Sequence, residues 1–347
     1  MDTQSIARHH LDVPGGRLYY EVRGSGPLLL VIGQPMTSAP FAPLADLLAE
    51  DHTVVTYDPP GLGESTVDDR SRDVTPEIEA DGLARIIDAV GGGPADMFGS
   101  SGGAVAGLAL AARHPEQVRT LIAHEPPVAE LLPDAAHVRA AVGATADAFR
   151  AYGSGAGWAN FVSLVMHDGP LTEAGPAPAQ WPPSGAGGGD SAGPNEKQQA
   201  DDELFFLRML KPFTRYQPPI DVLRAGRPRI VVGVGEASRG EIAPRAARAL
   251  AERLGSTALG FPGDHGGFMA DPAGFSATIR RLTAFGSSLR GRLRGRPHEP
   301  PWETPGNSLA RHCDRVGRDR APGARPPKCL DYRPGVPLVK ALALPGT

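Results

Sequence analysis

Cysteine is almost absent from this chain of 347 residues, and the two that occur, Cys313 and Cys329, lie near its C-terminal end. The rest of the chain has no thiol for a disulfide, which favours a reducing, cytoplasmic location. Long hydrophobic runs are also missing. The first apolar run, residues 28–32, is too short to cross a bilayer, and the first ten residues are polar. We therefore expect neither a signal sequence nor a membrane partner.

Excess charge of either sign is small, because 35 Lys and Arg against 39 Asp and Glu give a net charge of −4. The distribution is uneven: residues 286–347 carry +7, which leaves −11 on residues 1–285. An acidic body argues against nucleic acid as a partner. Residues 286–347 are also rich in Arg, Pro and Gly without a sustained periodicity, which predicts a disordered basic tail.

Short apolar runs alternate with amphipathic stretches along much of the chain. The pattern predicts strands at residues 17–23, 28–32, 53–57, 96–98, 118–123, 229–234 and 258–261. Helices are predicted between them, at residues 41–49, 75–90, 104–113, 242–254 and 272–285. Such alternation is typical of an α/β fold with a mostly parallel sheet and helices on both of its faces. We assign this core to residues 1–127 and 221–285.

The alternation stops after residue 127, and residues 128–220 are predicted to form an inserted helical lid. Helical patterns occur at residues 135–152 and 201–210, around a stretch rich in Gly and Pro. The insert holds many of the chain's aromatic residues: Trp158, Phe161, Trp181, Phe205, Phe206, Phe213 and Tyr216. They either line an apolar pocket or form the lid's own core, and the sequence leaves both interpretations open.

The segment Gly99-Ser100-Ser101-Gly102-Gly103 matches G-x-S-x-G, between a predicted strand and a predicted helix. A tight turn at this place exposes the serine hydroxyl and directs the next amide toward a developing oxyanion. Ser101 is therefore the candidate nucleophile, with the Gly102 amide as an oxyanion donor. A second match around Ser191 has no preceding strand, and we interpret it as a coincidence of composition.

A serine nucleophile needs a base, and His265 follows a late predicted strand with glycines on both sides. The alternative is an ordinary surface-loop histidine. His124 abuts an earlier strand and precedes the insert, out of order for the base. No spacing of His, Cys and Asp suggests a metal site, and Gly233-Val234-Gly235 is only part of a dinucleotide fingerprint, so we expect neither metal nor cofactor.

Residues 11–285 resemble the α/β-hydrolase superfamily. The resemblance rests on the elbow around Ser101, the Asp58-x-x-Gly61-x-Gly63-x-Ser65 turn and the late His265. It implies an acid that holds the histidine, and most of the superfamily has it after the strand that here ends at Val234, where this chain has Ser238.

A subset of the superfamily, including some haloalkane dehalogenases and the zearalenone lactonases, places a Glu after the preceding strand instead. Glu125 stands at that place, so the resemblance favours Glu125 as the acid. Glu236 is the main alternative, with Glu241 and Asp264 also open.

The second oxyanion donor should follow the strand at residues 28–32, where the superfamily commonly has His-Gly. This chain has Gly33-Gln34, and the backbone amide of Gln34 can still serve. Serine at the elbow argues against dehalogenase and epoxide-hydrolase chemistry, which uses Asp there. The resemblance implies a cofactor-independent serine hydrolase of a small apolar or aromatic ester or lactone, with a macrolactone as one substrate. The alternatives are an acyltransferase and a non-catalytic small-molecule-binding protein on the same fold.

Overall fold

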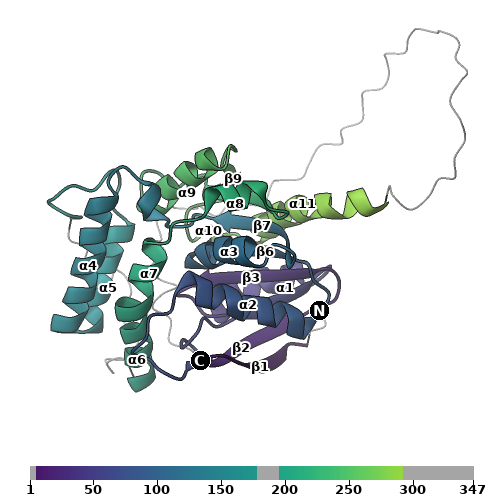
Figure 1. The fold of residues 1–347 in the computed structure, drawn as a ribbon, viewed down its shortest axis with the longest axis horizontal. Helices are drawn as coiled ribbons and strands as arrows, with labels where there is room; N and C mark the ends of the chain where they lie inside the picture. The colour runs from purple at the N-terminus through teal and green to yellow at the C-terminus, as the bar shows by residue number, and fades with distance from the viewer. Residues whose placement is uncertain (1–4, 178–194, 292–347) are drawn as a thin grey trace, which may run out of the picture.

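The computed structural model describes residues 5–177 and 195–291 (Figure 1). Ser191, Trp181 and the predicted tail beyond residue 291 lie outside the described residues. Among the described residues, no helix is long and apolar enough to cross a membrane.

A twisted nine-stranded sheet forms the centre of the described structure. Its order is β1 (Ala7–Val13), β2 (Gly16–Arg23), β4 (Thr53–Tyr57), β3 (Leu28–Gln34), β6 (Ala95–Ser101), β7 (Val118–His124), β8 (Arg229–Gly235) and β9 (Leu259–Phe261), with β5 (Thr66–Val67) beside β2. The pairs from β4 through β9 are parallel, whereas β2 pairs antiparallel with β1, β4 and β5. All seven residues of β3 are buried, as expected of a central strand covered on both faces.

Helices cover both faces of the sheet, which confirms the predicted architecture (Figure 1). One apolar cluster joins the sheet to the helices α1 (Ala42–Leu48), α10 (Gly267–Ala270) and α11 (Pro272–Gly291). The other joins it to α2 (Pro76–Val90), α3 (Gly102–Arg113), α8 (Ile220–Ala225) and α9 (Ile242–Arg253). Short 3₁₀ turns occur at Ala39–Phe41 and Ala129–Leu131.

Most of the chain between β7 and α8 forms helices that Figure 1 shows gathered at one end of the sheet. They are α4 (Ala135–Tyr152), α5 (Ser154–Val165), α6 (Glu196–Leu204), a π-helical turn (Phe205–Met209) and α7 (Leu210–Thr214). The helix predicted at residues 135–152 is confirmed, and the one predicted at 201–210 starts earlier and is interrupted by the π-helical turn. α5 was not predicted, because Gly155 and Gly157 weaken its helical propensity; burial of Trp158 compensates.

The structure differs from the prediction at both ends of the core. β1 is not among the predicted strands, because it is largely exposed and polar. An antiparallel edge strand tolerates such a pattern, since β2 supplies its hydrogen bonds. The last helix continues to Gly291 rather than ending at residue 285.

Candidate active site

Ser101 lies at a sharp turn between β6 and α3, and its backbone has φ 56° and ψ −124°. A positive φ is strained for a residue other than glycine, and it places the serine at the point where a buried strand becomes a helix. The glycines beside it are sterically required. A Cβ on Gly103 would lie 2.7 Å from the Cα of Gly33, and one on Gly99 would lie 2.6 Å from the carbonyl oxygen of Gly103. The close approach of β3, β6 and α3 therefore depends on these glycines.

Gln34 and Gly102 are both neighbours of the serine. Gln34 is the last residue of β3, and the parallel register pairs it with Ser101 of β6. Gly102 is the first residue of α3, where backbone N–H groups have no partner within the helix. Both line the same pocket as Ser101. The two predicted oxyanion donors thus come from neighbouring elements at the same end of the sheet.

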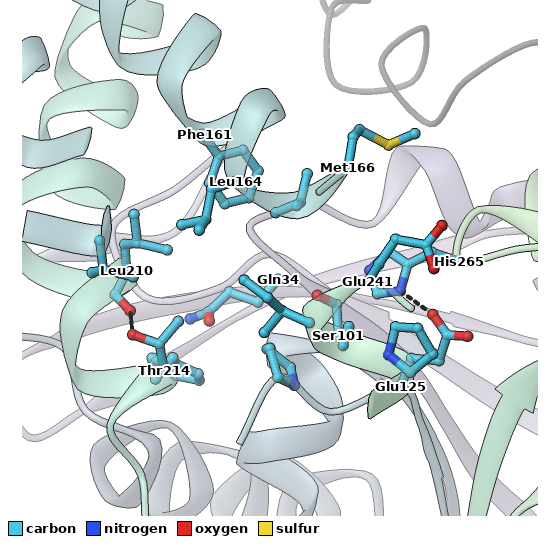
Figure 2. Close-up of a pocket in the computed structure, with 18 of the residues that line it drawn as sticks. Gln34, Ser101, Glu125, Phe161, Leu164, Met166, Leu210, Thr214, Glu241 and His265 are labelled. Atoms are coloured by element: carbon cyan, nitrogen blue, oxygen red, sulfur yellow. Dashed lines mark hydrogen bonds and ion pairs between the residues drawn. The ribbon is translucent and has the colours of Figure 1, made fainter. Parts of the chain in front are cut away.

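Glu125 and His265 form a hydrogen-bonded pair beside this turn. Nδ1 of His265 lies 2.6 Å from Oε2 of Glu125, and the amide of Gly235 donates to Oε1 at 2.8 Å. The Glu125 side chain is fully buried, and its backbone has φ 47° at the end of β7. Because Nδ1 is engaged, Nε2 is the nitrogen of His265 left for the pocket that Ser101 also lines (Figure 2).

Burial by itself raises the pKa of the Glu125 carboxyl. The hydrogen bond and charge of His265, with smaller contributions from His124 and the Ser238 hydroxyl, outweigh it and lower the pKa to about 2. Glu125 is therefore a carboxylate at neutral pH, and it can hold the His265 ring and stabilise its protonated form.

The other carboxylates weighed for this role lie differently. Glu236 is exposed, and its side chain approaches Gly260 of β9. Glu241 lines the pocket, but its carboxylate accepts from the backbone amide of Arg239. Asp264 also lines the pocket, and its carboxylate accepts from the backbone amide of Gly266. Within the part of the chain that the structure describes, Glu125 is the one carboxylate bonded to His265. Ser238, at the acid position of most α/β-hydrolases, hydrogen-bonds to Glu125 instead.

His124 has a place that the sequence did not reveal. It is fully buried, its Nδ1 lies 3.2 Å from Oγ of Ser100, and its ring packs 6.2 Å from that of His265 at 27°. Burial is the main cause that lowers the pKa of His124 to about 4, so its ring is neutral at physiological pH. It does not line the pocket, and its ring lies beside that of His265.

The pocket beside Ser101 has a cavity volume of about 130 Å³ and a mostly apolar lining. Its apolar residues are Met36, Pro127, Val138, Val142, Phe161, Leu164, Val165, Met166, Phe205, Leu210, Phe213, Ile242, Ala243 and Pro244. Figure 2 shows Phe161 and Leu210 across the pocket from His265. Both interpretations of the lid aromatics therefore apply: Phe161, Phe205 and Phe213 line the pocket, whereas Trp158 and Phe206 pack within the lid. No Lys or Arg occurs among the described residues of the lining.

The side chain of Gln34 belongs to a buried network of hydrogen bonds. Nε2 of Gln34 donates to Oε2 of Glu79 at 2.8 Å, and the Tyr57 hydroxyl donates to the other oxygen of Glu79. Sequence reasoning missed Glu79 because it is one of several acidic residues in α2. In residues 5–177 and 195–291, no group of three or more His, Cys, Asp or Glu side chains could hold a metal ion.

The chain is similar in sequence and in fold to known proteins. A family model described as the alpha/beta hydrolase fold matches residues 26–174. The uncharacterized hydrolase YraK of Bacillus subtilis is 42% identical over 123 residues, 35% of this chain and 45% of that protein. The zearalenone hydrolase of Cladophialophora bantiana is 32% identical over 115 residues, 32% of this chain and 43% of that protein.

Among solved structures, an esterase from Thermogutta terrifontis superposes with a TM-score of 0.59 at 19% identity, over 81% of this chain and 99% of that one. This likeness concerns the fold. The chain spans less than half of the length of the curated relatives that it matches.

Proposed function

This chain belongs to the α/β-hydrolase superfamily, and from that premise we propose that it is a serine hydrolase of carboxylic esters or lactones. The observation that carries the proposal is the buried Glu125 carboxylate bonded to Nδ1 of His265, next to the pocket that Ser101 lines. A serine in a strained turn, a histidine held in one tautomer and a buried acid are the parts that acyl transfer requires.

In the proposed reaction, Nε2 of His265 takes the proton of the Ser101 hydroxyl as its oxygen attacks the substrate carbonyl. The amides of Gly102 and Gln34 donate to the resulting oxyanion. Protonated His265, stabilised by Glu125, then gives its proton to the leaving alkoxide, and an acyl-enzyme remains. Water, deprotonated by His265, attacks the acyl group and releases the acid and the free serine.

The lining favours a neutral, mainly apolar substrate. Three carboxylates, those of Glu125, Glu241 and Asp264, contribute to it, and none of its described residues is a Lys or Arg. An anionic substrate would meet repulsion without a compensating cation. The similarity to a zearalenone hydrolase supports including lactones. From the cysteine usage we also place the proposed enzyme in the cytoplasm.

A fluorophosphonate probe tests the proposal. We expect it to label the full-length protein at Ser101, found by peptide mapping, and to abolish hydrolysis of p-nitrophenyl butyrate. The Ser101→Ala variant should lose labelling and hydrolysis together, whereas the matched Ser191→Ala variant should keep both. An unreactive Ser101 in a protein that binds esters tightly would favour a binding protein instead. Transfer of the acyl group to an added alcohol in preference to water would favour an acyltransferase.

A further inference from the structure

The side chain of Gln34 is a polar group in the mostly apolar lining of the pocket, close to the proposed oxyanion donors. Gln34 is 4% exposed and lines the pocket. Its Oε1 lies against Gly102, since a Cβ on Gly102 would collide with this oxygen. The amide oxygen of Gln34 is therefore next to Gly102, the residue whose backbone N–H is the proposed oxyanion donor.

Glu79 determines which end of the Gln34 amide faces the pocket. Oε2 of Glu79 accepts from Nε2 of Gln34, so the carbonyl end of the amide points the other way. The Tyr57 hydroxyl donates to the other oxygen of this carboxyl, Oε1, so Oε2 is the oxygen that accepts from the amide. Burial raises the pKa of Glu79 to about 8.

Oε1 of Gln34 has no donor among the described residues. The hydroxyl of Thr214, which also lines the pocket, donates instead to the carbonyl of Leu210 at 2.8 Å. An acceptor that faces an apolar pocket without a partner lowers the affinity for ligands that bury it unpaired. A ligand with its own donor at this place avoids that loss.

We propose that Oε1 of Gln34 accepts a hydrogen bond from a hydroxyl or N–H group of the substrate, on the acyl side and within one or two bonds of the scissile carbonyl. The preferred substrates are then hydroxy- or amino-acyl-type esters and lactones whose remainder is apolar. This inference rests on the proposed serine hydrolase function. Gln34 acts as a specificity-determining residue through its side chain, in addition to the backbone amide.

Matched esters test the inference on the full-length protein. The substrates are ethyl 2-hydroxybutanoate and ethyl 3-hydroxybutanoate, each against its methoxy counterpart and against ethyl butanoate, with hydrolysis followed by a pH indicator. We expect one hydroxy ester to exceed both of its partners about tenfold in kcat/KM, the effect of one buried hydrogen bond. Equal kcat/KM values for all five esters in the unmodified protein would overturn the inference.

The Gln34→Met variant removes the acceptor and keeps the length of the side chain. We expect its preference for the hydroxy ester to fall to within about twofold, while the Thr214→Val variant keeps the tenfold preference. If Gln34→Met keeps the tenfold preference for the hydroxy ester, another group causes that preference and the inference is overturned. Failure of the proposed function is distinguishable, because then no ester is hydrolysed and the fluorophosphonate does not label Ser101.

Discussion

Oε2 of Glu125 accepts a hydrogen bond of 2.6 Å from Nδ1 of His265, although 140 positions separate the two residues in the chain. The other carboxylate oxygen accepts from the Gly235 amide at the end of β8. Glu125 thus ties the end of β7 both to β8 and to the loop that carries His265. The same carboxylate holds the strand ends together and fixes the tautomer of the histidine.

Replacing Glu125 by Gln should lower kcat for p-nitrophenyl butyrate by about 10³-fold or more. A glutamine has one carbonyl oxygen for the two donors of Gly235 and His265, and its NH₂ group favours the tautomer with Nδ1 unprotonated. Nε2 then carries the proton and cannot act as base. The matched Glu236→Gln variant, at an exposed side chain outside the pocket, should stay within about twofold. A large loss in Glu236→Gln with little loss in Glu125→Gln would make Glu236 the acid.

A carboxylate at position 238 should partly replace Glu125. The Ser238 hydroxyl hydrogen-bonds to the Glu125 carboxylate, so an Asp side chain there would reach toward the same nitrogen of His265. We expect the double variant Glu125→Gln with Ser238→Asp to recover about tenfold in kcat over Glu125→Gln alone, because the protonated histidine regains a negative partner. Steady-state kinetics measure this; no recovery would mean that position 238 does not reach His265.

His124 should make the protein less stable as the pH falls from about 6.5 to about 4. Burial lowers the pKa of His124 from 6.5 to about 4 in the folded state. Between these two pH values the unfolded chain binds a proton at this residue that the folded chain does not. The free energy of unfolding therefore decreases as the pH decreases. The difference between the two pKa values corresponds to about 3 kcal/mol at most.

The His124→Phe variant isolates this contribution. Phe98, Phe261 and Phe275 surround the His124 ring, so a phenyl ring suits the site and does not titrate. Urea unfolding at pH 7 and at pH 4.5 should show a smaller loss of stability on acidification in His124→Phe than in the unmodified protein. An identical loss in both proteins would show that the acid sensitivity originates elsewhere.

Gly103 and Gly143 should respond in opposite ways to replacement by alanine. A Cβ on Gly103 meets the backbone of Gly33 and Ile32, which cannot move aside, so Gly103→Ala should cost about 2 kcal/mol or more and separate β3 from α3. Gly143 is exposed within α4 and a Cβ there meets nothing within 4 Å, so Gly143→Ala should stabilise by about 0.5–1 kcal/mol. Urea unfolding and esterase activity measured on both variants check the pair.

Features that depend on neighbours in the chain could be predicted from the sequence. The turn around Ser101 is an example, because its glycines, the apolar strand before it and the apolar helix after it are consecutive. The helix beginning after Thr75 is another, since Thr75 caps it and Pro76 suits its first turn. Local propensity and local sterics determine both.

Features that depend on register between distant strands could not be derived from neighbouring residues alone. The resemblance favoured Glu125 as the acid, but Glu236, Glu241 and Asp264, which also follow predicted strands or lie in the loops near them, stayed open. The pairing of β7 with β8, in which the Glu125 amide donates to the Gly233 carbonyl, aims Glu125 at the histidine. The buried position of Glu79 likewise follows from the packing of α2 against the sheet.

The sequence by itself determined that the chain alternates strands and helices and places a serine in a turn between a buried strand and a helix, because these properties are encoded by consecutive residues. Only the tertiary structure decided which carboxylate holds His265 and which way the amide of Gln34 faces. Both depend on side chains that approach one another across the sheet, where burial and hydrogen bonding select one partner among several that the chain offers.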